Sequence, residues 1–119
     1  MILFAKRSKA ATPIAVTITG TGHASRCGVT INGTAYTNAT TGIEVMPGDT
    51  IIFSIQGYRL EFLGLYGYVK IDGTEVLKET TGNIATYEWN VPGGITSIAI
   101  ELRYGSGSYA FGQIIVTTA

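Results

Sequence analysis

Two stretches with the same pattern determine the expected fold: VTINGTAY at residues 29–36 and VKIDGTEV at residues 69–76. In both, apolar and polar residues alternate up to an Asn-Gly or Asp-Gly pair, and Thr begins a second run. Such pairs accept the positive φ angles of a type I′ turn, and alternation on either side is typical of a β-hairpin. The sequence therefore predicts two tight hairpins, with turns at residues 32–33 and 72–73.

The parallel between the two stretches continues past the hairpins. Residues 29–42 read VTINGTAYTNATTG and residues 69–82 read VKIDGTEVLKETTG, so both end in Thr-Thr-Gly. Two copies are too few for a solenoid. One explanation is an internal duplication. We favour the other, in which each sheet of one domain needs the same few turn residues.

Alternating apolar residues extend along most of the remaining chain. Thr, Val, Ile and Tyr dominate it, and the long Ala, Leu, Glu and Lys runs of helices are absent, so β-structure is favoured. Residues 76–80 are the one place where a helical turn would fit. Eight or nine short strands separated by glycine-containing turns indicate an antiparallel β-sandwich, immunoglobulin-like or jelly-roll-like.

The chain of 119 residues suits one domain, expected at residues 13–119, preceded by an N-terminal arm at residues 1–12. The arm carries apolar Ile2, Leu3 and Phe4 followed by basic Lys6 and Arg7. We expect it to dock on this domain or on a neighbour. A secretory signal places its basic residues first, and a membrane span needs about 18 apolar residues. We therefore expect neither export nor a membrane partner.

The charge balance narrows the class of partner. Charged residues make up 13% of the chain and the formal net charge is zero. A nucleic-acid-binding protein usually has a basic excess, because neutralising phosphate supplies most of its affinity. A nearly neutral surface repels neighbours weakly. We therefore expect protein partners, including further copies of this chain, and no nucleic acid.

Residues suited to catalysis are few. His23 is the single histidine and Cys27 the single cysteine, which excludes multi-histidine metal sites and a cysteine zinc cage. We expect Cys27 to be a small buried apolar group. The carboxylates are scattered, and Asp49 and Asp72 fall in predicted turns, where they bond nearby backbone N–H groups. The sequence thus predicts no enzyme, no catalytic residue, no metal site and no cofactor.

The segment YRLEFLGLYGY at residues 58–68 is rich in aromatic residues. Three interpretations are open for it, and the first is that alternate members fill the core, because area burial dominates the use of aromatic side chains. The second is a protein interface, where Tyr and Arg are enriched; its candidates here are Tyr58, Arg59, Phe62 and Tyr66. The third is a glycan site, in which exposed rings stack on sugars; its candidates are Tyr58, Tyr66, Tyr68 and Trp89.

Taken together, the two hairpins, VMPGDTIIFSI at residues 45–55 and YAFGQIIVTTA at residues 109–119 resemble the immunoglobulin-like sandwiches of tailed-bacteriophage virion proteins. The match spans most of residues 13–119. It departs from antibody domains at Cys27, which has no partner for their inter-sheet disulfide.

The resemblance implies a small structural subunit, such as a capsid decoration protein or a tail-associated component. Such a protein would be made in the host cytoplasm and located in the virion. It would bind neighbouring subunits through its arm and its strand edges. The alternative function is a carbohydrate-binding module that uses exposed Tyr and Trp side chains.

Overall fold

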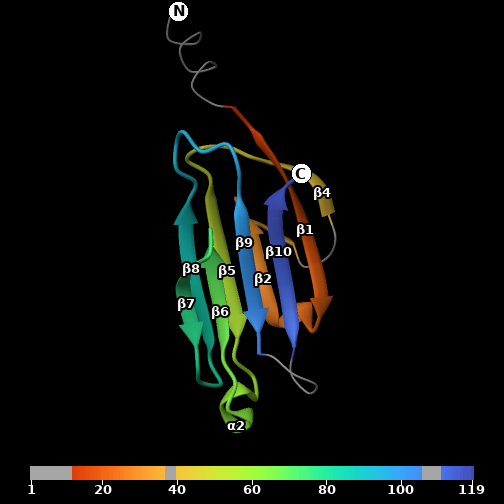
Figure 1. The fold of residues 1–119 in the computed structure, drawn as a ribbon, viewed down its shortest axis with the longest axis vertical. Coiled ribbons are helices and arrows are strands. Elements are labelled where there is room, and N and C mark those ends of the chain that lie inside the picture. The colour runs from red at the N-terminus through yellow and green to blue at the C-terminus, as the bar shows by residue number, and fades with distance from the viewer. Residues whose placement is uncertain (1–11, 37–39, 106–110) are drawn as a thin grey trace, which may run out of the picture.

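The computed structural model describes residues 12–36, 40–105 and 111–119, and it forms a two-layer β-sandwich (Figure 1). Ten strands in two antiparallel sheets confirm the predicted fold class, with more strands than the eight or nine expected. Residues 1–11 of the predicted arm lie outside the described residues.

The two sheets differ in size. The large sheet has the order β4 (Thr40–Val45), β1 (Ile14–Gly22), β10 (Gly112–Thr118), β9 (Ala99–Tyr104), β6 (Gly67–Ile71), β7 (Thr74–Glu79). The small sheet has the order β3 (Thr34–Tyr36), β2 (Cys27–Ile31), β5 (Thr50–Gln56), β8 (Ile84–Asn90). Two short helical turns complete the described elements, η1 (Ala24–Arg26) and α2 (Leu60–Leu63). Neither is long and apolar enough to cross a membrane.

Seven of the strands follow the order found in immunoglobulin domains. The neighbours β2-β5-β8 correspond to strands A-B-E, and β7-β6-β9-β10 correspond to C′-C-F-G. The remaining strands of the large sheet, β1 and β4, add to it beyond β10.

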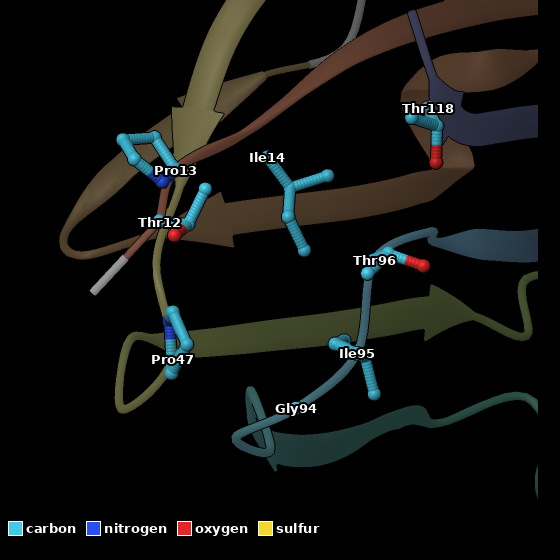
Figure 2. A pocket seen from close by; sticks show the side chains of 8 residues that line it. All are labelled: Thr12, Pro13, Ile14, Pro47, Gly94, Ile95, Thr96 and Thr118. Atoms are coloured by element: carbon cyan, nitrogen blue, oxygen red, sulfur yellow. The ribbon is translucent and has the colours of Figure 1, made fainter. Parts of the chain in front are cut away.

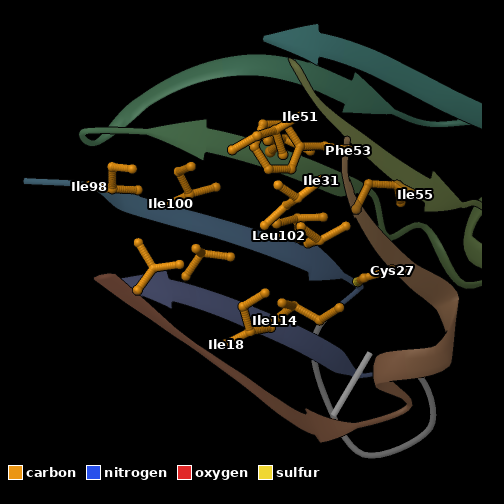
Figure 3. Packing of buried hydrophobic residues seen from close by; sticks show 14 of the residues in the cluster. Ile18, Cys27, Ile31, Ile51, Phe53, Ile55, Ile98, Ile100, Leu102 and Ile114 are labelled. Carbon is orange, nitrogen blue, oxygen red and sulfur yellow. The ribbon is translucent and has the colours of Figure 1, made fainter. Parts of the chain in front are cut away.

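The core lies between the sheets and is built by alternation along the strands. Ile18, Leu102 and Ile114 of the large sheet face Phe53 and Ile31 of the small sheet (Figure 3). All five side chains are buried, with at most 5% of each exposed. Side chains of a strand point alternately to its two faces, so these apolar positions form one continuous interior.

Both predicted hairpins are confirmed. Asn32 and Asp72 have φ angles of 47° and 51°, and each is followed by a glycine with positive φ. Each hairpin also bonds a third strand in the same way: Asn32 N–H donates to Thr50 O at 3.0 Å, and Asp72 N–H donates to Ala99 O at 2.8 Å.

The strand pairings repeat along the chain as the sequence does. When every strand number is raised by four, three pairs of the first half give three pairs of the second half: β1–β4 gives β5–β8, β2–β3 gives β6–β7, and β2–β5 gives β6–β9. The two hairpins stand in different sheets. The sequence parallel is therefore also a parallel in topology.

The helical turn forms at a different place from the one considered in the sequence. Residues 76–79 belong to strand β7, and the helical turn α2 lies instead at Leu60–Leu63. Gly64 follows the turn with a φ of 69°, the left-handed conformation that commonly ends a helix. Leu60 is fully buried and anchors the turn to the core.

Candidate interaction surfaces

The loop between β5 and β6 projects from the end of the sandwich away from the C-terminus (Figure 1). We call residues 57–66 the tip. The tip exposes 84% of Phe62, 47% of Tyr58, 45% of Leu63 and 44% of Tyr66. These four are most of the large apolar side chains that the described residues expose. Such a cluster at one end is typical of an interaction site.

Hydrogen bonds tie the tip to the sandwich. Gly57 N–H donates to Asn83 O at 2.8 Å, directly before β8, and within the tip Leu60 N–H donates to Gly57 O at 3.0 Å. The hydroxyl of Tyr104, at the end of β9, donates to the carbonyl oxygen of Tyr58. With Leu60 buried, the exposed aromatic rings stand on a backbone that is fixed at several points.

The structure excludes the core interpretation for three of the four aromatic residues of the segment. The core interpretation is wrong for Tyr58, Phe62 and Tyr66, because the helical turn breaks the strand alternation that would have turned them inward. Arg59 is exposed beside them, so the described interface candidates are brought together at the tip. The other interface candidates lie outside the described residues: Ile2, Leu3, Phe4, Lys6 and Arg7.

The glycan candidates do not form one exposed, coplanar set of rings. Trp89 faces inward and packs against the core, paired with Ile51 of β5. The rings of Tyr66 and Tyr68 have centroids 6.1 Å apart and are tilted by 46°, so they form no flat platform. Lys78 Nζ lies 4.4 Å from the centroid of the Tyr66 ring. A sugar stacking on that face of the ring would have to displace the ammonium group.

The outer face of the large sheet carries a polar network centred on Glu101. Its Oε2 accepts hydrogen bonds from the Tyr68 hydroxyl at 3.0 Å and from Gln113 Nε2 at 2.8 Å. Arg103 Nε lies 3.7 Å from the same oxygen. Burial, and then the bond to Glu101, raise the pKa of Tyr68 above its ordinary value. A shallow groove of about 240 Å³ adjoins this network and is lined in part by Lys70 and Glu101.

Two arginine side chains lie next to the Tyr58 ring of the tip. The guanidinium carbon of Arg26 is 4.3 Å from the centroid of the Tyr58 ring, and that of Arg59 is 5.9 Å from it. Together with His23 and Tyr104 these residues line a cavity of about 150 Å³. The sequence did not indicate Arg26 as a site residue, because it is far along the chain from the tip and no motif links the two.

The opposite end of the sandwich has a larger groove, of about 420 Å³ (Figure 2). Its lining is mainly proline and isoleucine with threonine hydroxyls: Thr12, Pro13, Ile14, Pro47, Gly94, Ile95, Thr96 and Thr118. Thr12 and Pro13 are the first described residues of the chain. The groove therefore borders the point where the predicted arm joins the domain.

The side chains suited to chemistry are dispersed. In residues 12–36, 40–105 and 111–119, no three His, Cys, Asp or Glu side chains are placed to hold a metal ion. Cys27 is 2% exposed, as expected for a small apolar group. Burial raises the pKa of its thiol from the ordinary 9.0 to about 12. A thiol of this kind is a poor nucleophile.

Comparisons with protein-family models, curated proteins and solved structures gave no match. Among the described residues, the tip gathers four of the six large apolar side chains that are exposed, and Glu101 accepts two side-chain hydrogen bonds on the outer face of the large sheet.

Proposed function

We propose that the protein is a non-enzymatic structural subunit that binds a neighbouring protein through its tip. The observation that carries this proposal is Phe62, which is 84% exposed on a loop tied to the sandwich by hydrogen bonds. Burying a Phe side chain on association contributes about 1.5–3 kcal/mol. Because its backbone is already fixed, the tip loses little conformational entropy on binding.

The surroundings of Phe62 fit a protein partner. Tyr58, Tyr66 and Arg59 are exposed on the same loop, and aromatic residues with Arg dominate the binding energy of protein interfaces. Charged residues, at 13% of the chain, are also scarce, as they are at interface cores.

The assembly that we propose is a tailed-bacteriophage virion, in which the chain is a capsid decoration or tail-associated subunit. The resemblance to immunoglobulin-like virion domains supports this setting, and so does the immunoglobulin strand order. The arm at residues 1–12 is the proposed second attachment. Its apolar start would bind a neighbour, and the outer strands of each sheet, such as β4 and β8, offer edges for main-chain pairing.

Incorporation into particles tests the tip. Virions are produced with wild-type protein, with Phe62→Ser, and with Ile52→Ser, a matched loss of an exposed apolar side chain on the outer face of β5. We expect Phe62→Ser to lower the copies per particle by about tenfold or more and Ile52→Ser to leave them unchanged. Normal incorporation of Phe62→Ser would refute the tip as the docking site.

Removal of residues 1–12 tests the arm in the same assay. Strand β1 begins at Ile14, so the truncated chain keeps every strand of the sandwich. We expect unchanged circular dichroism and loss of incorporation. If the truncated protein enters particles normally, the arm is not an attachment.

A carbohydrate-binding module is the second candidate function, and the outer face of the large sheet is the surface that favours it. The groove of about 240 Å³ lies beside Glu101, whose carboxylate and its Gln113 partner suit sugar hydroxyls. A glycan array decides this candidate. Binding that Tyr68→Ala abolishes would support it, and an array without binding would dismiss it.

A further inference from the structure

The cavity behind the tip is lined by His23, Arg26, Tyr58, Arg59 and Tyr104. Its lining thus supplies two guanidinium groups and an imidazole but no carboxylate. Each guanidinium has five N–H donors and no acceptor. The volume, about 150 Å³, is sufficient for a small oxyanion or an acidic side chain.

The charges of the chain leave both guanidinium groups without an acidic partner. All eight Asp and Glu residues lie in the described part of the chain, and the ion pair found there joins Glu101 to Arg103 on the outer face of the large sheet. The two carboxylates at the tip end are directed elsewhere. Glu79 accepts the backbone N–H of Thr81 at 2.6 Å, and Glu61 Oε1 lies beside Gly82.

The position of Arg26 is fixed before any ligand binds. His23 N–H donates to Phe111 O at 2.7 Å, and Arg26 N–H donates to His23 O at 2.9 Å, which closes the turn η1. A Cβ at Gly112 would collide with the His23 carbonyl, so β10 packs directly against this turn. The Tyr58 ring then supports the guanidinium through a cation–π contact.

Arg59 holds a strained backbone at the same cavity. Its φ of 69° and ψ of −3° lie in the left-handed region, which is disfavoured for a long side chain by about 1–2 kcal/mol. Gly or Asn would adopt this conformation at less cost. Strain of this kind concentrates at ligand sites, where it directs a side chain.

We propose that this cavity is an oxyanion-binding site and that it accepts a carboxylate of the neighbouring protein. Arg26 and Arg59 donate N–H groups to the carboxylate oxygens, and charge-assisted bonds of this type are about twice as strong as neutral ones. The inference rests on the proposed docking at the tip, because Tyr58 and Arg59 belong both to the tip and to the cavity. The partner would thus present an acidic side chain beside the apolar surface that covers Phe62.

A titration of the isolated protein tests the site, with succinate as the carboxylate probe and inorganic phosphate as the alternative oxyanion. The side-chain Nε–Hε signals of both arginines are followed by NMR at constant ionic strength. We expect saturable shifts with succinate, about tenfold weaker binding in Arg26→Gln, and no change in Lys70→Gln, which removes one positive charge from the large sheet. If Arg26→Gln unfolds, the exposed Arg59→Gln takes its place.

Three results would overturn the inference: shifts without saturation, equal binding in Arg26→Gln, or phosphate binding about tenfold tighter than succinate. Incorporation into particles separates this inference from the proposed function. If Phe62→Ser fails to incorporate while Arg26→Gln incorporates normally, the tip docks but the cavity receives no carboxylate. If both incorporate normally and succinate still saturates, the docking is wrong and the oxyanion site stands on its own.

Discussion

Two sets of aromatic side chains differ in what they do for this protein. Phe53 and Tyr104 lie on strands and are buried in the core, whereas Tyr58, Phe62 and Tyr66 lie on the tip and are largely exposed. A strand fixes the direction of every second side chain, so its aromatic residues fill the interior. The helical turn in the tip interrupts this alternation. The comparison shows that apolar side chains in one segment serve stability and those in the next are available for contact.

Phe53→Ala tests the core side of this comparison with the largest expected effect. The side chain is fully buried between the sheets, so its removal leaves a cavity and lowers the free energy of unfolding by about 3–5 kcal/mol. Urea denaturation measures the loss. Phe53→Leu, which keeps most of the volume, is the control and loses less than about 2 kcal/mol. A loss below about 1 kcal/mol for Phe53→Ala would contradict the described core.

The thiol of Cys27 gives a second test of the core through pH. Below the ordinary pKa of 9.0 the thiol is neutral in both states, and stability does not depend on it. Between 9.0 and about 12 the unfolded chain carries a thiolate while the folded protein keeps a thiol, so rising pH favours unfolding. From pH 9 to pH 11 we expect the wild type to lose about 2–3 kcal/mol more than Cys27→Ala. Parallel pH profiles for the two proteins would show that the thiol is not buried.

The sequence predicted the parts of the fold that depend on neighbouring residues. The turns at 32–33 and 72–73 follow from Asn-Gly and Asp-Gly, and the buried strands follow from alternation. The alternation of Tyr87, Trp89 and Val91 with polar residues favours an inward Trp89, so the glycan interpretation of this residue went against a local signal. Which strands pair, as β8 does with β5, is a tertiary property that a local pattern does not contain.

The candidate site was predicted only in part, because some of its residues meet through tertiary contacts that a local pattern does not contain. The aromatic residues of the tip were identified as candidates, since they are adjacent in sequence. Their exposure depends on the left-handed conformations of Arg59 and Gly64, and only the glycine makes such a conformation predictable. Arg26 reaches Tyr58 because strands β2 and β5 pair, and the sequence carries no local signal of that contact.

Arg59→Gly tests whether the backbone of the tip is strained. Phe53→Ala lowers the free energy of unfolding, whereas this variant is expected to raise it, by a smaller amount. Glycine adopts the φ of 69° without steric conflict, and this gain exceeds the entropy that glycine loses on folding. We therefore expect the free energy of unfolding to rise by about 0.5–1 kcal/mol, measured by urea denaturation. Asp72→Gly is the control, because Asp accepts its φ of 51° with less strain and the gain is smaller. A loss of stability in Arg59→Gly would show that the arginine side chain stabilises the tip itself.

Phe62→Ala has the smallest expected effect on stability and separates the two aromatic sets most directly. With 84% of the side chain exposed, its removal changes the free energy of unfolding by less than about 0.5 kcal/mol, measured by thermal and urea denaturation. The same chemical change at Phe53 would remove a large part of the stability of a domain of this size. If Phe62→Ala destabilised the protein by more than about 1 kcal/mol, the ring would be packing against the protein's own surface. It would then not be free for a neighbour, and the comparison between core and tip would fail.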